Sequence, residues 1–167
     1  MLISLKEFIR TDDIAMDLNE SFKANSEIFG DIDFSGECTL IGRIYRLGEG
    51  FSLDSKFVYS YMEKCSRCMK EFENTIETDI KVEIVESLSE DTLDDEIAEV
   101  LIDKEKNVDI TEAIKQAIYL SLPMKPLCKE DCNGLCPKCG KDLNIGDCDC
   151  DREDCDPRFE KLKSLLK

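Results

Sequence analysis

The chain has 167 residues, of which 42% are hydrophobic, enough for one globular domain or one domain with a small appendage. Its formal net charge is −16, and it has ten cysteines but no histidine, which excludes a Ser-His-Asp triad, a Cys-His dyad and any histidine-ligated metal site. No apolar run reaches the roughly 20 residues of a membrane span, and residues 1–10 lack a signal-peptide pattern, so we expect no membrane association and a cytoplasmic protein with reduced thiols.

The first half of the chain predicts β-strands. Residues 51–61 alternate between apolar and polar side chains, which is the period of a half-buried strand. Glycines at positions 48 and 50 predict a turn just before that segment. Successive segments of this kind favour an antiparallel meander, as a sheet, a small barrel or a sandwich. The expected strands are residues 2–5, 21–29, 37–47, 51–61 and 72–85.

The excess negative charge lies before residue 123. Residues 83–105 alone contain ten acidic residues and one basic residue, Lys104, so we expect a solvated segment with an acidic loop at 86–96. Residues 97–102 fit either a strand or a helical turn. Binding of nucleic-acid phosphates relies on lysine and arginine, so this composition argues against non-specific RNA binding. The nearly neutral residues 123–167 are the better candidate for any RNA contact.

Two helices are predicted in the second half of the chain. Residues 109–122 place their apolar side chains on one helical face, and Asp109 with Glu112 three residues later has the spacing of a capping box. A terminal helix is expected to begin at Asp156 and Pro157, an N-cap followed by proline at the first helical position.

Eight of the ten cysteines occur in close pairs. Two thiolates a few residues apart can both reach one metal ion at about 2.3 Å without distorting the backbone, and two pairs complete a tetrahedron. Four thiolates leave no open position for catalysis, so such sites are structural. The sequence therefore predicts two zinc sites built from Cys65, Cys68, Cys128, Cys132, Cys136, Cys139, Cys148 and Cys150.

Loop length favours one grouping of these pairs. Only eight residues separate Cys139 from Cys148, so the pairs 136/139 and 148/150 form a local site at a small entropic cost. Gly140 follows the first of these pairs, where a tight knuckle often needs a positive φ. The pairs 65/68 and 128/132 then form a long-range site. Joining 128/132 to 136/139 is also local and stays open as an alternative.

Other thiol chemistry fits this pattern less well. An iron–sulfur cluster also takes four cysteines, although the spacing here is closer to a zinc ribbon. A redox pair would need a Cys-x-x-Cys at a helix N-terminus in a βαβ setting, whereas Cys65 and Cys68 interrupt strand-like sequence. Free thiols in some of the pairs are the remaining alternative.

These features together predict an α+β protein. It would have an antiparallel β-sheet or barrel-like domain with a central helix, then a C-terminal Cys-rich zinc module and a terminal helix. The expected boundary separates a mainly β domain at residues 1–122 from a zinc-ribbon-like module at residues 123–167. No phosphate loop, paired-carboxylate motif or small-molecule site stands out, so we expect a protein that is not an enzyme.

The same motifs resemble the YceD family, whose members are called large ribosomal RNA subunit accumulation proteins. The resemblance covers most of the chain and is most specific over residues 122–159. It is carried by Tyr61 with Cys65-Ser66-Arg67-Cys68, LPMKPLC at 122–128, CNGLCPKCGKDLN at 132–144, CDC at 148–150 and DPRF at 156–159. Family members without the distal pairs keep a pair like 65/68 and cysteine or histidine near 128 and 132, which supports the long-range grouping.

The resemblance implies a role in accumulation of 23S rRNA and assembly of the large ribosomal subunit, without a known reaction. The implied partners are rRNA or a large-subunit ribosomal protein, to which the acidic segment is complementary if that protein is basic. The alternative is a zinc-stabilised protein–protein adaptor with no RNA contact, and a thiol redox sensor is less favoured. Candidate contacts to rRNA or to a partner are Arg67, Lys138, Lys141, Arg152 and Arg158.

Overall fold

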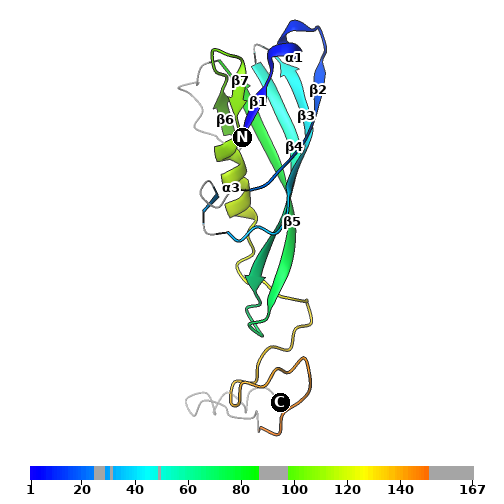
Figure 1. The fold of residues 1–167 in the computed structure, drawn as a ribbon, viewed down its shortest axis with the longest axis vertical. Coiled ribbons are helices and arrows are strands. Elements are labelled where there is room, and N and C mark those ends of the chain that lie inside the picture. Colours follow the sequence, from blue (N-terminus) through cyan, green and yellow to red (C-terminus); the bar gives the residue numbers. More distant parts are fainter. Residues whose placement is uncertain (25–28, 31, 49, 87–97, 151–167) are drawn as a thin grey trace, which may run out of the picture.

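The computed structural model describes residues 1–24, 29–30, 32–48, 50–86 and 98–150 (Figure 1). The molecule is elongated, with a body of strands and a helix at one end and the cysteine-rich segment at the other. The predicted terminal helix, Arg152, Arg158 and nearly all of the predicted acidic loop lie outside the described residues. The elements are β1 (Leu2–Ser4), α1 (Lys6–Arg10), β2 (Ala15–Phe22), β3 (Cys38–Leu47), β4 (Gly50–Lys64), β5 (Glu71–Val85), β6 (Ala98–Leu101), β7 (Asn107–Asp109) and α3 (Thr111–Ser121).

The main sheet has five strands in the order β2-β3-β4-β5-β6. Strands β2 to β5 form the predicted antiparallel meander. Strand β6 runs parallel to β5, so the sheet is mixed and not purely antiparallel. Within the described ranges β2 and β6 are its two edges, which makes it an open sheet and not a barrel. A separate antiparallel pair joins β1 to β7.

Two segments differ from their prediction, and a third settles an alternative that the sequence left open. The first edge strand is β2, at Ala15–Phe22, and overlaps the predicted segment 21–29 only at its end. Leu18 is the one fully buried residue of β2, so the apolar pattern that marks this strand in the sequence is weak. Residues 97–102, which fitted a strand or a turn, contain strand β6. The acidic stretch 83–105 is not one solvated segment, since residues 83–85 belong to β5 and residues 98–101 form β6.

Strands β4 and β5 form a long hairpin of 15 residues on each side. Their register runs from Phe51 opposite Ile84 to Lys64 opposite Glu71. The neighbouring strand β3 pairs with β4 only as far as Val58. The outer half of the hairpin therefore projects beyond the sheet, and its tip carries the first cysteine pair toward the cysteine-rich segment (Figure 1).

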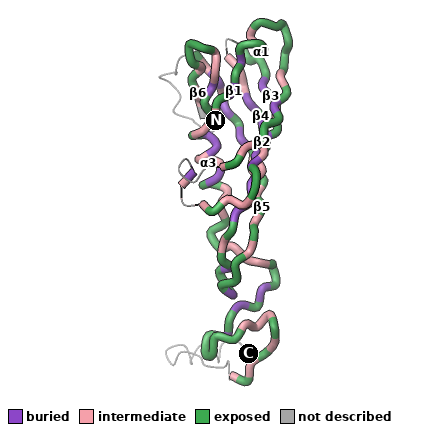
Figure 2. The backbone as a smooth tube through the Cα atoms, viewed as in Figure 1, coloured by how far each residue is buried: buried purple, intermediate pink, exposed green. Residues whose placement is uncertain are grey.

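Helix α3 packs on one face of the sheet, against β5, and so covers the sheet from the side instead of occupying its centre. Its inner side buries Ala113, Ile114 and Ile118. Tyr59 of β4 lies beneath the helix, 1% exposed, with its hydroxyl 2.9 Å from Ser121 Oγ. Figure 2 shows the buried positions along the strands and this helix, so the hydrophobic core lies between them.

The predicted capping box at the start of α3 is wrong. Asp109 is the last residue of β7 and is paired with Leu2, so it is held in the strand two residues before the helix. Its carboxylate accepts the backbone N–H of Thr111 at 3.0 Å, while Glu112 pairs with Lys115 at 2.6 Å. No helix within the described residues is both long and apolar enough to cross a membrane.

Candidate metal centres

The eight paired cysteines converge into two groups of four. In each group the four Sγ atoms lie within 4.8 Å of one another. The first group joins residues 65 and 68 to 128 and 132, and the second joins 136 and 139 to 148 and 150. Loop length favoured this grouping. The structure does not bring the pairs 128/132 and 136/139 together into one group, which was the alternative.

The sulfur separations fit a metal ion better than a disulfide. Cys65 Sγ lies 3.7 Å from Cys132 Sγ, and Cys68 Sγ lies 3.6 Å from Cys128 Sγ. Bonds of about 2.3 Å to a tetrahedral zinc place the sulfurs about 3.8 Å apart. A disulfide would need about 2.05 Å between the sulfurs. The sulfur separations of the first group therefore suit a metal ion, and the second group has the same four-thiol composition with its sulfurs within 4.8 Å of one another.

The hairpin tip positions the first group. A turn follows β4, in which Cys65 N donates to Lys70 O and Met69 N donates to Cys65 O, both at 2.9 Å. Ser66 N donates to Pro126 O at 2.8 Å, which ties the tip to the chain that leaves α3. The thiols of this group lie inward, and Cys65 is 0% exposed. The group thus joins the β-sheet to the cysteine-rich segment.

The second group begins with the same turn. Cys136 N donates to Lys141 O at 2.9 Å, and Gly140 N donates to Cys136 O at 2.8 Å. Gly140 has the predicted positive φ, +73°, and Met69 occupies the equivalent place in the first turn with φ +60°. The spacing Cys-x-x-Cys-x-Lys occurs at 65–70 and again at 136–141, and this repeat in the sequence, not noted above, corresponds to the repeated turn. Unlike the first group, the second is partly open, since Cys139 is exposed.

Backbone N–H groups favour one thiolate in each group. At Cys65, burial opposes ionisation, but the N–H groups of Cys128, Cys68 and Arg67 outweigh it and lower the pKa to about 6. At Cys136, the N–H groups that follow it in the knuckle lower the pKa to about 6. Burial and the neighbouring thiols raise the pKa of Cys128 to about 12. A metal ion must therefore displace protons from part of each group when it binds.

Two of the predicted contact residues, Arg67 and Lys141, have internal partners in the structure. Arg67 donates from Nη1 to Cys132 O at 2.8 Å, while its own carbonyl accepts Leu135 N–H at 3.1 Å. Lys141 donates to Asp147 O in the second loop. Lys138 is exposed and takes the place in the second knuckle that Arg67 takes in the first. Arg67 therefore fastens the hairpin tip to the cysteine-rich segment, a role that the sequence did not indicate.

The loops of the two groups also pair with each other. Leu143 N donates to Gly134 O at 2.9 Å, and Leu135 and Asp142 form an isolated antiparallel bridge. Gly134 has φ +73°, and a Cβ added there would lie 3.0 Å from Arg67 O. The positive φ favours glycine at this crossing, and a side chain there would also push Arg67 O away by a few tenths of an ångström.

Comparison with known proteins identifies the family. The sequence model of the family described as large ribosomal RNA subunit accumulation protein YceD matches residues 53–166. The chain belongs to the YceD family. The matched range begins within β4 and includes both cysteine groups, so the two candidate metal centres lie in the part of this YceD family member that defines the match.

Several relatives are similar over different shares of their length. An uncharacterized protein of Mycobacterium tuberculosis is 28% identical over 127 residues, which cover 74% of this chain and 59% of the relative. The chain thus spans about three fifths of that relative. The uncharacterized protein YlbN of Bacillus subtilis is 28% identical over 156 residues, 93% of this chain and 87% of the relative. A chloroplastic YCED homolog of Arabidopsis thaliana, named as a large ribosomal RNA subunit accumulation protein, is 37% identical over 60 residues, 36% of this chain and 19% of the relative. No solved structure matches the chain.

Proposed function

We propose that this protein is a non-enzymatic ribosome-biogenesis factor that acts in the cytoplasm and supports accumulation of 23S rRNA and assembly of the large subunit. Membership of the YceD family, whose description names large ribosomal RNA subunit accumulation, carries this proposal. The architecture supports it, because four thiols in each group suit a structural cross-link between chain segments and leave no open coordination position for catalysis.

Each cysteine group is proposed to hold one structural zinc ion. Zinc bound by four thiolates supplies a cross-link between chain segments and no reactive water. At the first group this cross-link would join the hairpin tip to residues 126–135, so that the module at residues 123–167 is held in a defined position on the domain at residues 1–122. Arg67 and Gly134 shape this junction from the protein side.

The proposed partner is rRNA or a ribosomal protein of the large subunit. Lys138, Lys141, Arg152 and Arg158 are the proposed contacts, together with the guanidinium of Arg67. The net charge of −16 favours a second candidate function, a protein–protein adaptor with no RNA contact. Four-thiolate zinc centres, which carry −2 each, would strengthen that charge.

Depletion of the protein in its host tests the role in rRNA accumulation. We expect the ratio of 23S to 16S rRNA to fall, and plasmid-borne wild-type protein to restore it. A Cys65→Ser/Cys68→Ser variant is expected to restore it poorly, whereas Cys38→Ala, which changes a buried cysteine outside both groups without adding a polar group, should restore it. An unchanged ratio after depletion would contradict the proposed function.

A salt titration separates the two modes of action. Suppose that three of the five proposed residues each contact one phosphate. Affinity for a 23S rRNA fragment should then fall by about 20- to 40-fold between 50 and 200 mM salt. Lys138→Ala should weaken binding to every RNA sequence by about the same factor, because a phosphate contact does not depend on the bases. An adaptor would bind no RNA even at low salt while its depletion still lowered 23S rRNA.

A further inference from the structure

Asn144 connects the two cysteine groups. It lies in the second group's loop, between Cys139 and Cys148, yet its side chain reaches the first group. Asn144 Nδ2 is 3.5 Å from Cys132 Sγ and 2.7 Å from Asp142 Oδ1. Cys132 is 2% exposed, so this amide approaches a buried sulfur from the side of the second loop.

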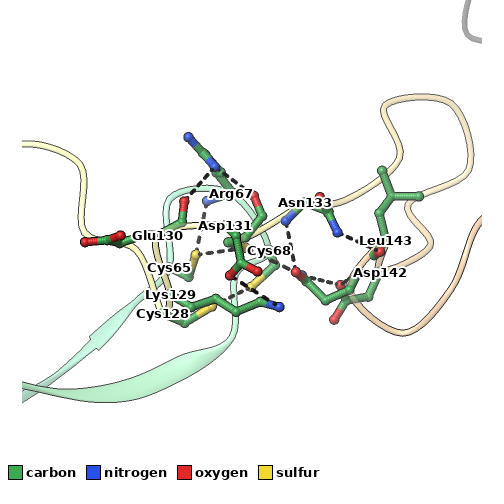
Figure 3. Close-up of polar contacts among 12 residues, drawn as sticks. Cys65, Arg67, Cys68, Cys128, Lys129, Glu130, Asp131, Asn133, Asp142 and Leu143 are labelled. Carbon is green, nitrogen blue, oxygen red and sulfur yellow. Dashed lines mark hydrogen bonds and ion pairs between the residues drawn. The ribbon is translucent and has the colours of Figure 1, made fainter.

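The orientation of the amide follows from its partners. Asn144 Oδ1 lies 2.9 Å from the backbone nitrogen of Asn133, which can only donate. The amide NH₂ group must then face Cys132 and the carboxylate of Asp142, both of which accept. Asn144 N also donates to Asp142 Oδ1 at 2.9 Å, and these bonds hold the pKa of Asp142 below its usual value. Figure 3 shows Asn133, Asp142 and Leu143 beside the first group.

The second group holds the loop that carries this amide. Its two cysteine pairs bracket residues 140–147, and Lys141 closes the loop by donating to Asp147 O. The pairing of Leu143 N with Gly134 O then sets the loop against the chain just after Cys132. A metal ion in the second group therefore fixes the loop from which Asn144 reaches the first group.

We infer that Asn144 is a positioning residue that couples the two centres, so that zinc in the second group raises the affinity of the first group for zinc. This inference rests on the proposed zinc occupancy of both groups. An N–H donated to a ligating sulfur orients that ligand and lowers its charge density, and loss of such a partner typically costs 10- to 100-fold in metal affinity. Coupling between two binding equilibria is reciprocal, so zinc in the first group raises the affinity of the second by the same factor.

Zinc titration of the full chain against a chromophoric chelator tests the coupling. The Cys65→Ser/Cys68→Ser protein retains only the second group and thereby assigns the two binding steps. Asn144→Asp keeps the oxygen that accepts from Asn133 N–H but loses the donor, and it should weaken the first site about tenfold. Asn144→Ala, which adds no charge, should act in the same direction. Asn133→Ala is the matched control, because its side chain contacts Leu143 O and no sulfur.

A double-mutant cycle isolates the role of Asn144. Cys139→Ser/Cys148→Ser should weaken the first site by about the same tenfold, and adding Asn144→Ala to it should cause no further loss. Far-UV circular dichroism checks that every variant keeps the β-sheet. Additive losses, or a first site unchanged by Asn144→Ala, would overturn the coupling while leaving the zinc proposal intact. A wild-type protein that binds no zinc would overturn both.

Discussion

Removal of metal with a strong chelator should release residues 126–150 from the hairpin tip while the sheet stays folded. Among the described residues, the cluster at the junction has little apolar material, since its buried members are Cys65, Cys68 and Cys132, with Phe72, Leu127 and Cys128 packed around them. Structural zinc contributes on the order of 10 kcal/mol of apparent binding free energy, far more than such a cluster supplies by burial. The junction should therefore depend on the metal.

Hydrogen exchange followed by mass spectrometry measures this release. The amides of Ser66, Leu135 and Cys136 should lose at least about a thousandfold of protection after chelation. Amides in β3 and in the part of β4 beside it should keep theirs, and they serve as the internal control. Equal protection of the junction with and without chelator would show that packing alone holds it.

Tyr59→Ala should lower the free energy of unfolding by about 3–5 kcal/mol, the largest effect that we expect from a single substitution in the sheet. The ring lies between Phe57 and Tyr61, with centroids 5.5 and 5.8 Å away, and is 1% exposed. Its removal leaves a cavity beneath α3. Tyr59→Phe loses only the hydrogen bonds of the hydroxyl to Ser121 Oγ and Ile118 O and should cost about 1 kcal/mol.

Urea unfolding measures both substitutions. Tyr119→Ala is the matched control, because Tyr119 lies on α3, the helix that covers Tyr59, but is 58% exposed and should change stability by about 0.5 kcal/mol or less. The slope against urea should stay the same in all variants. A loss below about 1 kcal/mol for Tyr59→Ala would mean that α3 does not pack on the sheet as described.

Local patterns predicted the parts of the fold that bury a regular face. The meander from β3 to β5 follows the apolar and β-branched content of residues 37–47 and the alternation in 51–61 and 72–85, and the structure confirms it. The helix at 109–122 follows its apolar spacing, although its start moved to Thr111. Loop-closure entropy was enough to favour the grouping of the thiols that the structure shows, because eight intervening residues make the local site easy to form.

The remaining features depend on contacts between distant segments. A strand was predicted at residues 2–5 and β1 lies there, but it pairs with β7 outside the main sheet and not within the meander. Strand β7 has three residues and no recognisable pattern alone, so this pairing could not be predicted. The edge strand β2 is weakly patterned because one of its faces is nearly all exposed. Arg67 and Asn144 acquire their roles from partners 65 and 12 residues away, which no local spacing encodes.

The occupancy of the two cysteine groups is the central claim, and native mass spectrometry tests it most directly. The intact protein should carry two zinc ions, and the Cys65→Ser/Cys68→Ser variant should carry one. Cys38→Ala, which alters a cysteine outside both groups, should still carry two. An intact protein without zinc, or a Cys65→Ser/Cys68→Ser variant that still carries two ions, would contradict the account.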